Sequence, residues 1–90
     1  MQEFDFRPRG VCARNIHFAL DDTGETLEEL SVTGGCDGNL KALSKVLKGE
    51  KVSRIIELLD GNTCGPRPTS CMDQLCKGLK IAQRTLREDA

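Results

Sequence analysis

The first half of the chain alternates apolar and polar residues with the two-residue period of β-strands. This alternation covers residues 3–7, which are followed by Pro8, and residues 14–20. A third alternating segment ends at Thr33. Proline confines the first segment to the edge of a sheet or ends it. The apolar positions within each segment share one face: Phe4 and Phe6, then Ile16, Phe18 and Leu20, then Leu30 and Val32. The pattern predicts three short strands.

The sequence Asp-Asp-Thr-Gly at residues 21–24 separates the second and third segments. It is typical of a tight turn, because glycine accepts positive φ angles and aspartate bonds to nearby backbone. These two segments are therefore predicted to form a hairpin. His17, the one histidine of the chain, falls on the strand face opposite Ile16 and Phe18. We interpret it as a surface residue, with a ligand role as the alternative.

The second half carries apolar residues at helical spacing. A first helix is predicted over residues 40–47, and Gly49 suits the position that follows a helix. A second helix is predicted over residues 52–59, closed by Gly61. The proline-containing loop 62–68 then interrupts the helical pattern.

The last helix is predicted to begin at Cys71, with Ser70 as the cap residue that forms a capping box with Asp73. Its apolar stripe consists of Met72, Leu75, Leu79, Ala82 and Leu86. Strands thus precede helices along the chain. This order predicts an α+β fold in which a three-stranded antiparallel sheet from the N-terminal half is covered on one face by three helices from the C-terminal half. Residues 1–90 contain no linker or repeat, so we expect one domain.

Hydrophobic residues make up 38% of the chain and aromatic residues only 3%, which predicts a thin aliphatic core. Domains of 90 residues or fewer often add a metal, a disulfide or a partner subunit to such a core. The chain has five cysteines. Either disulfides or metal ligation would use them.

The compartment helps to choose between these two uses. Residues 1–10 are rich in charge, and the chain has no apolar run long enough for a signal peptide or a membrane span, so we expect a cytoplasmic protein. Thiols stay reduced there, and an odd cysteine count favours metal ligands with one spare thiol. The formal net charge of −1 argues against nucleic acid or an anionic membrane as partner.

The first four cysteines lie where predicted elements begin or end: Cys12, Cys36, Cys64 and Cys71. The predicted hairpin places Cys12 opposite Gly35, and therefore beside Cys36. Cys36 and Cys71 each open a helix, and Cys64 lies in the constrained loop just before Cys71. All four are predicted to meet at one end of the domain.

Four thiolates in a closed set suit tetrahedral zinc or an iron-sulfur cluster, and the residues alone do not separate the two. Helix N-termini also favour the negative charge of a ligand set. Scattered reduced thiols are the alternative. Cys76 lies beside the apolar stripe of the last helix and is interpreted as core. Asp37 and Asp73 each follow a site cysteine and are interpreted as helix caps, with metal tuning as the alternative.

Catalysis by the chain alone is not predicted. His17 is distant in sequence from the cysteines that open helices, Ser70 has no evident base, and the Gly-Gly-Cys sequence that ends at Cys36 lacks the lysine of a phosphate-binding loop.

Four stretches of the chain resemble the TSCPD domain family: residues 10–12, 35–39, 64–65 and 69–75. Met72 stands where the family name has proline. The family also forms a C-terminal region of vitamin B12-dependent ribonucleotide reductases. The resemblance therefore implies a role accessory to ribonucleotide reductase, and thus to DNA synthesis, or to a related redox system, with a protein partner. A ribonucleoside-diphosphate reductase acting by itself is a further reading, disfavoured because 90 residues leave no room for its nucleotide and cobalamin sites.

The order of elements and cysteines is also similar to the NifU/IscU-type iron-sulfur scaffolds, which implies an IscU-like fold. Cys12, Cys36 and Cys71 match that pattern, whereas Arg14 stands where the scaffolds have aspartate and Cys64 is an added thiol. An iron-sulfur scaffold or transfer protein is thus an alternative function. A thiol redox protein is another.

Overall fold

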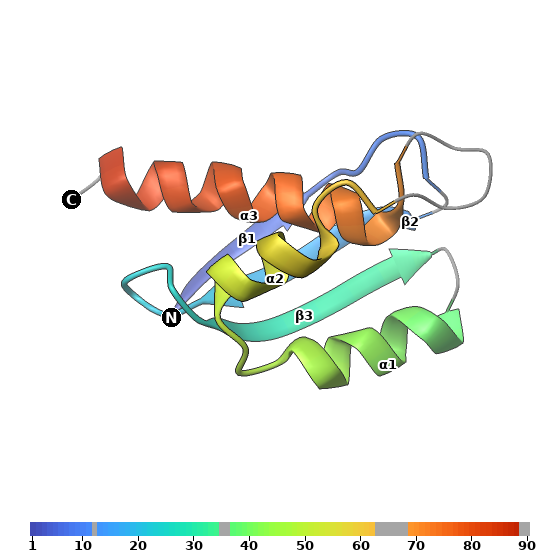
Figure 1. Ribbon diagram of the computed structural model, residues 1–90, viewed down its shortest axis with the longest axis horizontal. Helices are drawn as coiled ribbons and strands as arrows, with labels where there is room; N and C mark the ends of the chain where they lie inside the picture. Colours follow the sequence, from blue (N-terminus) through green and yellow to red (C-terminus); the bar gives the residue numbers. More distant parts are fainter. Residues whose placement is uncertain (12, 35–36, 63–68, 89–90) are drawn as a thin grey trace.

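The computed structural model describes residues 1–11, 13–34, 37–62 and 69–88. Three strands come first and three helices follow: β1 (Gln2–Phe6), β2 (Ala13–Leu20), β3 (Leu27–Gly34), α1 (Asp37–Leu47), α2 (Val52–Leu59) and α3 (Cys71–Glu88). Figure 1 shows α3 running along the sheet, with α2 beside it and α1 alongside β3. The predicted α+β fold, with strands before helices, is confirmed.

The strands form one antiparallel sheet in the order β1-β2-β3. Phe4 pairs with Phe18 across β1 and β2, and Ile16 pairs with Val32 across the predicted hairpin. The turn between β2 and β3 uses a glycine with positive φ, Gly24 at 78°. A hairpin centred on this turn was the sequence prediction, and it is correct. The pairing is irregular at two places, between Ala13 and Asn15 and between Ala19 and Leu20.

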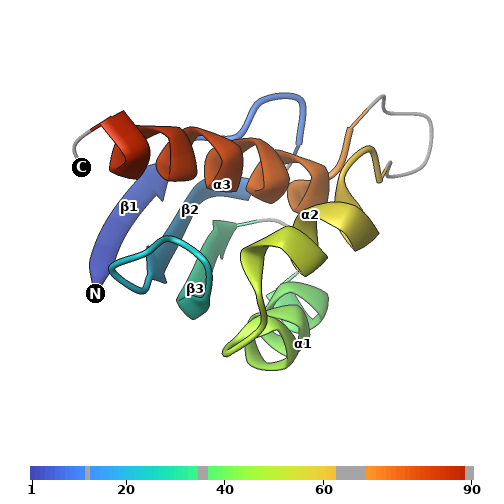
Figure 2. The same ribbon diagram turned by 60° about the vertical axis from the view of Figure 1, so that its left-hand side comes forward.

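Helices α3 and α2 lie over the sheet face that carries the aromatic residues, and α1 lies beside β3, as Figure 2 shows. The rings of Phe4 and Phe18 stack with centroids 5.5 Å apart. Helix α3 lies close to the sheet at Gly78, where an added Cβ would be 3.0 Å from Phe6 and 3.3 Å from Phe18. A glycine is needed here because the helix backbone lies almost against the rings.

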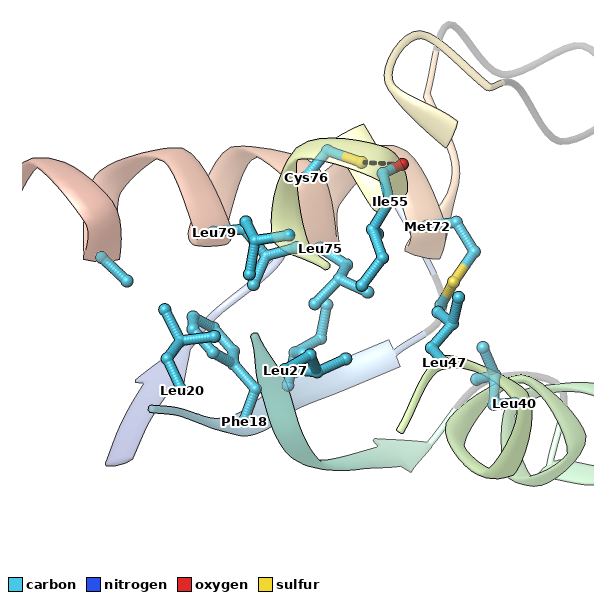
Figure 3. Packing of buried hydrophobic residues seen from close by; sticks show 13 residues of the cluster. Phe18, Leu20, Leu27, Leu40, Leu47, Ile55, Met72, Leu75, Cys76 and Leu79 are labelled. Carbon is cyan, nitrogen blue, oxygen red and sulfur yellow. Dashed lines mark hydrogen bonds between the residues drawn. The ribbon is translucent and has the colours of Figure 1, made fainter. Parts of the chain in front are cut away.

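The buried core joins residues from β2, β3 and all three helices, and Figure 3 shows its packing. Its members are Ile16, Phe18, Leu20, Leu27, Leu40, Leu47, Val52, Ile55, Met72, Leu75, Cys76, Leu79 and Ala82. Most were predicted from periodicity. The core is aliphatic apart from Phe18 and the two sulfur residues, as the composition predicts.

Two details differ from the sequence predictions. β3 begins at Leu27, earlier than the alternation at Leu30 indicated, because Leu27 pairs with Leu20 and is completely buried. Ala19 is also completely buried, although alternation assigned it to the polar face. Its cross-strand neighbours are Glu3 and Glu29, whose longer side chains flank the small methyl group.

Candidate functional site

One of the four predicted metal ligands, Cys71, lies among the described residues. It is the first residue of α3, its side chain is half-buried, and its thiol is not in a disulfide. Cys12, Cys36 and Cys64 lie outside the described residues. The candidate site is therefore defined by the described residues on either side of these three cysteines.

The residues that flank Cys12 and Cys36 are neighbours in the sheet. Ala13, which follows Cys12, pairs with Gly34, which stands two positions before Cys36. Helix α1 begins at Asp37, directly after Cys36. The hairpin therefore brings together the described residues that flank the first two cysteines.

The connection between β1 and β2 is held against the start of α3. The backbone amide of Arg9 donates a hydrogen bond to Oε1 of Gln74 at 3.1 Å. Gly10 lies against Thr69, since an added Cβ would be 3.3 Å from its methyl carbon, and Gly10 has a positive φ of 74°. The segment that precedes Cys12 therefore lies beside the segment that precedes Cys71.

Asn62 and Ser70 join the two ends of the segment that contains Cys64. The Asn62 side chain donates to the Ser70 hydroxyl at 3.2 Å, and this hydroxyl donates to the Asn62 carbonyl at 2.6 Å. Ser70 Oγ also accepts the backbone N–H of Asp73 at 3.1 Å, the capping contact that the sequence predicted. The loop thus starts and ends at the N-terminus of α3.

The Asp73 carboxylate does not complete the predicted capping box. It accepts the backbone N–H of Gly61 at 2.7 Å and the hydroxyl of Thr69, and so links α3 to the end of α2. The Thr69 hydrogen bond, followed by that of Gly61, lowers the pKa of this carboxyl group. Asp73 is 6% exposed, so a structural role rather than metal tuning explains it best.

These contacts form a continuous network, which we call the polar clamp. It comprises the side chains of Asn62, Thr69, Ser70, Asp73 and Gln74 with the backbone amides of Arg9 and Gly61. Among the described residues, no buried side-chain nitrogen or oxygen lacks a hydrogen-bond partner. The end of β3 and the starts of β2, α1 and α3 lie at one end of the domain (Figure 1). The described neighbours of all four cysteines therefore converge.

Sequence reasoning did not identify the polar clamp as a network. Thr69, Asp73 and Gln74 are all buried, although they are polar. Polar residues in the first turn of a helix usually read as exposed caps. They are buried together because the segments of Arg9, Gly61 and Asn62 all pack on the N-terminus of α3. Periodicity within one segment does not reveal such packing.

Cys76 has the role that the sequence predicted. It is completely buried in the core, and its Sγ lies 3.8 Å from the Ile55 carbonyl oxygen, as Figure 3 shows. Burial raises the pKa of this thiol to about 11, so it stays protonated at neutral pH. A neutral core thiol packs as a small hydrophobic group.

His17 lies on the sheet face opposite Ile16 and Phe18, where it lines a hollow with Ser44 of α1, and it is paired with acidic residues. Its Nδ1 is 3.0 Å from Asp5, and its Nε2 is 3.4 Å from Glu3. The hydrogen bond to Asp5 raises the pKa of His17. It is half-exposed, which fits the surface role predicted for it.

Within the described ranges, His, Cys, Asp and Glu side chains form no group of three or more suited to a metal ion, and those ranges hold one proposed ligand, Cys71.

Fold and site together define a small α+β domain in which the described neighbours of the cysteines lie at one end of the sheet. The family model for the TSCPD domain matches residues 2–83, and the chain belongs to the TSCPD domain family. Comparisons with curated proteins and with solved structures found no match. None of the helices in the described part has the length and apolar character needed to cross a membrane.

Proposed function

We propose that this chain is a small cytoplasmic metal-binding module that serves a protein partner. The four thiolates that would hold the metal are those of Cys12, Cys36, Cys64 and Cys71. The observation that supports this most strongly is the convergence of their described neighbours through the hairpin and the polar clamp. Loops of different origin are held together there by hydrogen bonds, as a preformed ligand set requires.

The chemistry of the donor set fits either zinc or an iron-sulfur cluster. Both metals favour soft sulfur ligands. Bound zinc would cross-link the loops and contribute folding free energy, whereas a bound cluster would carry an electron. The chain's own part is to fix the loops, through the Gln74 contact to Arg9 and the Asn62 contacts to Ser70.

A second candidate function is a thiol redox or cluster-transfer protein. The observation that favours it is the pair of hydrogen bonds between Asn62 and Ser70, the described residues on either side of Cys64, at the start of the helix that begins with Cys71. Two such thiols would suit reversible disulfide exchange. A visible absorption band, or two thiols that titrate reversibly, would support this function over a structural zinc site.

Membership of the TSCPD family supports a partner connected with ribonucleotide reductase or a related redox system. The chain would then bind that enzyme or supply it with electrons. The polar clamp lies at the end of the domain where the cysteines are predicted to meet, so a partner that contacts the metal end would approach there.

The experiment compares Cys71→Ser with Cys76→Ser, a matched change of a cysteine on the same helix. We expect Cys71→Ser to lose metal and to lower Tm by about 10 °C or more, because a structural metal contributes several kcal/mol. Cys76→Ser places a hydroxyl in the core and costs about 1–3 kcal/mol, but should keep its metal. Equal metal content in both variants and in the unmodified chain would contradict the proposal.

A further inference from the structure

A hollow of about 510 Å³ lies at the end of the sheet where β1 leaves and β2 enters. Its lining consists of Arg7, Pro8, Ala13, Arg14 and Asn15. Two of these five residues are arginines, and they come from opposite sides of the β1–β2 connection. The hollow is therefore lined by an arginine on each side of the connection.

A β-bulge directs one of the two arginines. Ala13 pairs with Gly34 and Asn15 pairs with Thr33, so Arg14 has no partner in the β2–β3 ladder. An unpaired residue of this kind bends the strand and turns its side chain away from the regular alternation. Alternation alone would assign Arg14 to the core face with Ile16, but the bulge leaves it exposed and beside the hollow.

The guanidinium groups of Arg7 and Arg14 have no ion-pair partner in the described part of the chain. The acidic residue nearest in the sheet, Asp5, uses its carboxylate elsewhere. Asp5 accepts a hydrogen bond from the Asn15 side chain at 3.1 Å and lies 3.0 Å from Nδ1 of His17. Among the described residues, the two arginines at the hollow therefore have no acidic partner, in a chain whose formal net charge is −1.

We propose that this hollow binds a phosphate group, held by the guanidinium groups of Arg7 and Arg14. A guanidinium group presents a planar set of N–H donors that matches phosphate oxygens, and it is always charged. Phosphate carries up to two negative charges near neutral pH, so it matches two arginines better than a carboxylate does. The proposal rests on Arg7 and Arg14 alone and is independent of the metal site.

Two sources would supply this chemistry, a free phosphate or pyrophosphate and the phosphate of a nucleotide. Titrations of the 15N-labelled chain with inorganic phosphate, pyrophosphate and a nucleoside monophosphate, at constant ionic strength, separate them. We expect saturable shifts of the backbone amides of Arg7, Arg14 and Asn15. Tighter binding of the nucleotide than of inorganic phosphate would identify a nucleotide site, and equal binding a site for the phosphate group alone. Acetate at the same ionic strength should give no saturable shift.

The variants are Arg14→Gln and Arg7→Gln, with Arg84→Gln as the matched control, an exposed arginine on α3. Removing one charged hydrogen-bonding partner should weaken phosphate binding about tenfold, while Arg84→Gln should leave it unchanged. Arg7 lies outside the strands and so tests the proposal even if the bulge variant misfolds. Metal content measured on the same samples should not change. Equal affinity in all four proteins, or no saturation at tens of millimolar phosphate, would overturn the proposal.

Discussion

The backbone amide of Arg9 and the side-chain oxygen of Gln74 are 3.1 Å apart and join two segments separated by 65 residues. This hydrogen bond holds the connection before Cys12 against the first turn of α3, which begins with Cys71. Gln74 also donates to the Thr69 hydroxyl at 3.0 Å. One buried side-chain amide therefore bonds both to the β1–β2 connection and to the residues just before α3. The position of the β1–β2 connection thus depends on a helix at the other end of the sequence.

Gln74→Ala should therefore loosen the candidate site. We expect a loss of about 1–3 kcal/mol of stability, because the change leaves buried partners unsatisfied. We also expect metal to dissociate more readily from the variant. Chemical denaturation measures the first effect, and metal transfer to a chelator measures the second.

Gln83→Ala is the matched control for Gln74→Ala. Gln83 lies on the same helix and donates to the Gly24 carbonyl at 2.9 Å, at the turn between β2 and β3. It should lose some stability but keep the metal affinity of the unmodified chain. Equal metal affinity in Gln74→Ala and Gln83→Ala would show that the polar clamp does not support the metal site.

Much of the fold could be predicted because the signals were local. Alternation indicated the strands, and Gly49 and Gly61, both with positive φ, follow the first two helices. Periodicity failed where a partner segment decided the outcome. Leu27 joins β3 because Leu20 lies opposite, and Arg14 forms a bulge because the pairing on either side of it shifts.

The candidate site could be predicted in part. Element ends and hairpin geometry predict that the cysteines meet, and this stays a prediction; what the structure describes is that the residues flanking them lie at one end of the domain. Metal binding itself stays a prediction, as do the partner and the IscU-like description of the fold. The polar clamp was not predictable from one segment at a time, because Asp73 bonds to Gly61 in place of the adjacent helix cap.

His17 should make stability depend on pH. Its pKa is raised above the ordinary value of 6.5 by Asp5, so the pair stabilises the fold fully below that value. This contribution is lost as pH rises through the folded-state pKa. The pKa of Asp5 is lowered below 3.8, chiefly by Asn15 and then by His17. The stability that the Asp5 carboxylate contributes is therefore present above 3.8 and is lost as the pH falls through its folded-state pKa.

The measurement is Tm between about pH 5 and pH 9 for the unmodified chain and for His17→Gln. The difference in Tm should be small, because solvent screens an exposed pair, and should vanish at high pH. Glu29→Gln, on the same sheet face, is the control and should retain the pH dependence. A difference between the unmodified chain and His17→Gln that stays constant with pH would contradict this reasoning.

Gly78→Ala tests the close approach of α3 to the sheet. Alanine favours helix by up to about 1 kcal/mol over glycine, but its methyl would lie 3.0 Å from Phe6. Forcing an extra methyl into a packed core costs about 1–3 kcal/mol, so we expect net destabilisation. Thr85→Ala, an exposed change on the same helix, should be neutral within about 0.5 kcal/mol. A more stable Gly78→Ala would show that the helix moves away without cost.

The central claim, a metal held by four cysteines, is tested most directly by metal and sulfide analysis with a visible spectrum on anaerobically purified protein. We expect one metal site per chain, filled either by zinc without colour or by iron with sulfide and a visible band. In the folded, metal-loaded protein no thiol should then react with a thiol reagent, because four thiolates hold the metal and Cys76 is completely buried. Neither metal nor sulfide, with all five thiols free, would contradict the claim.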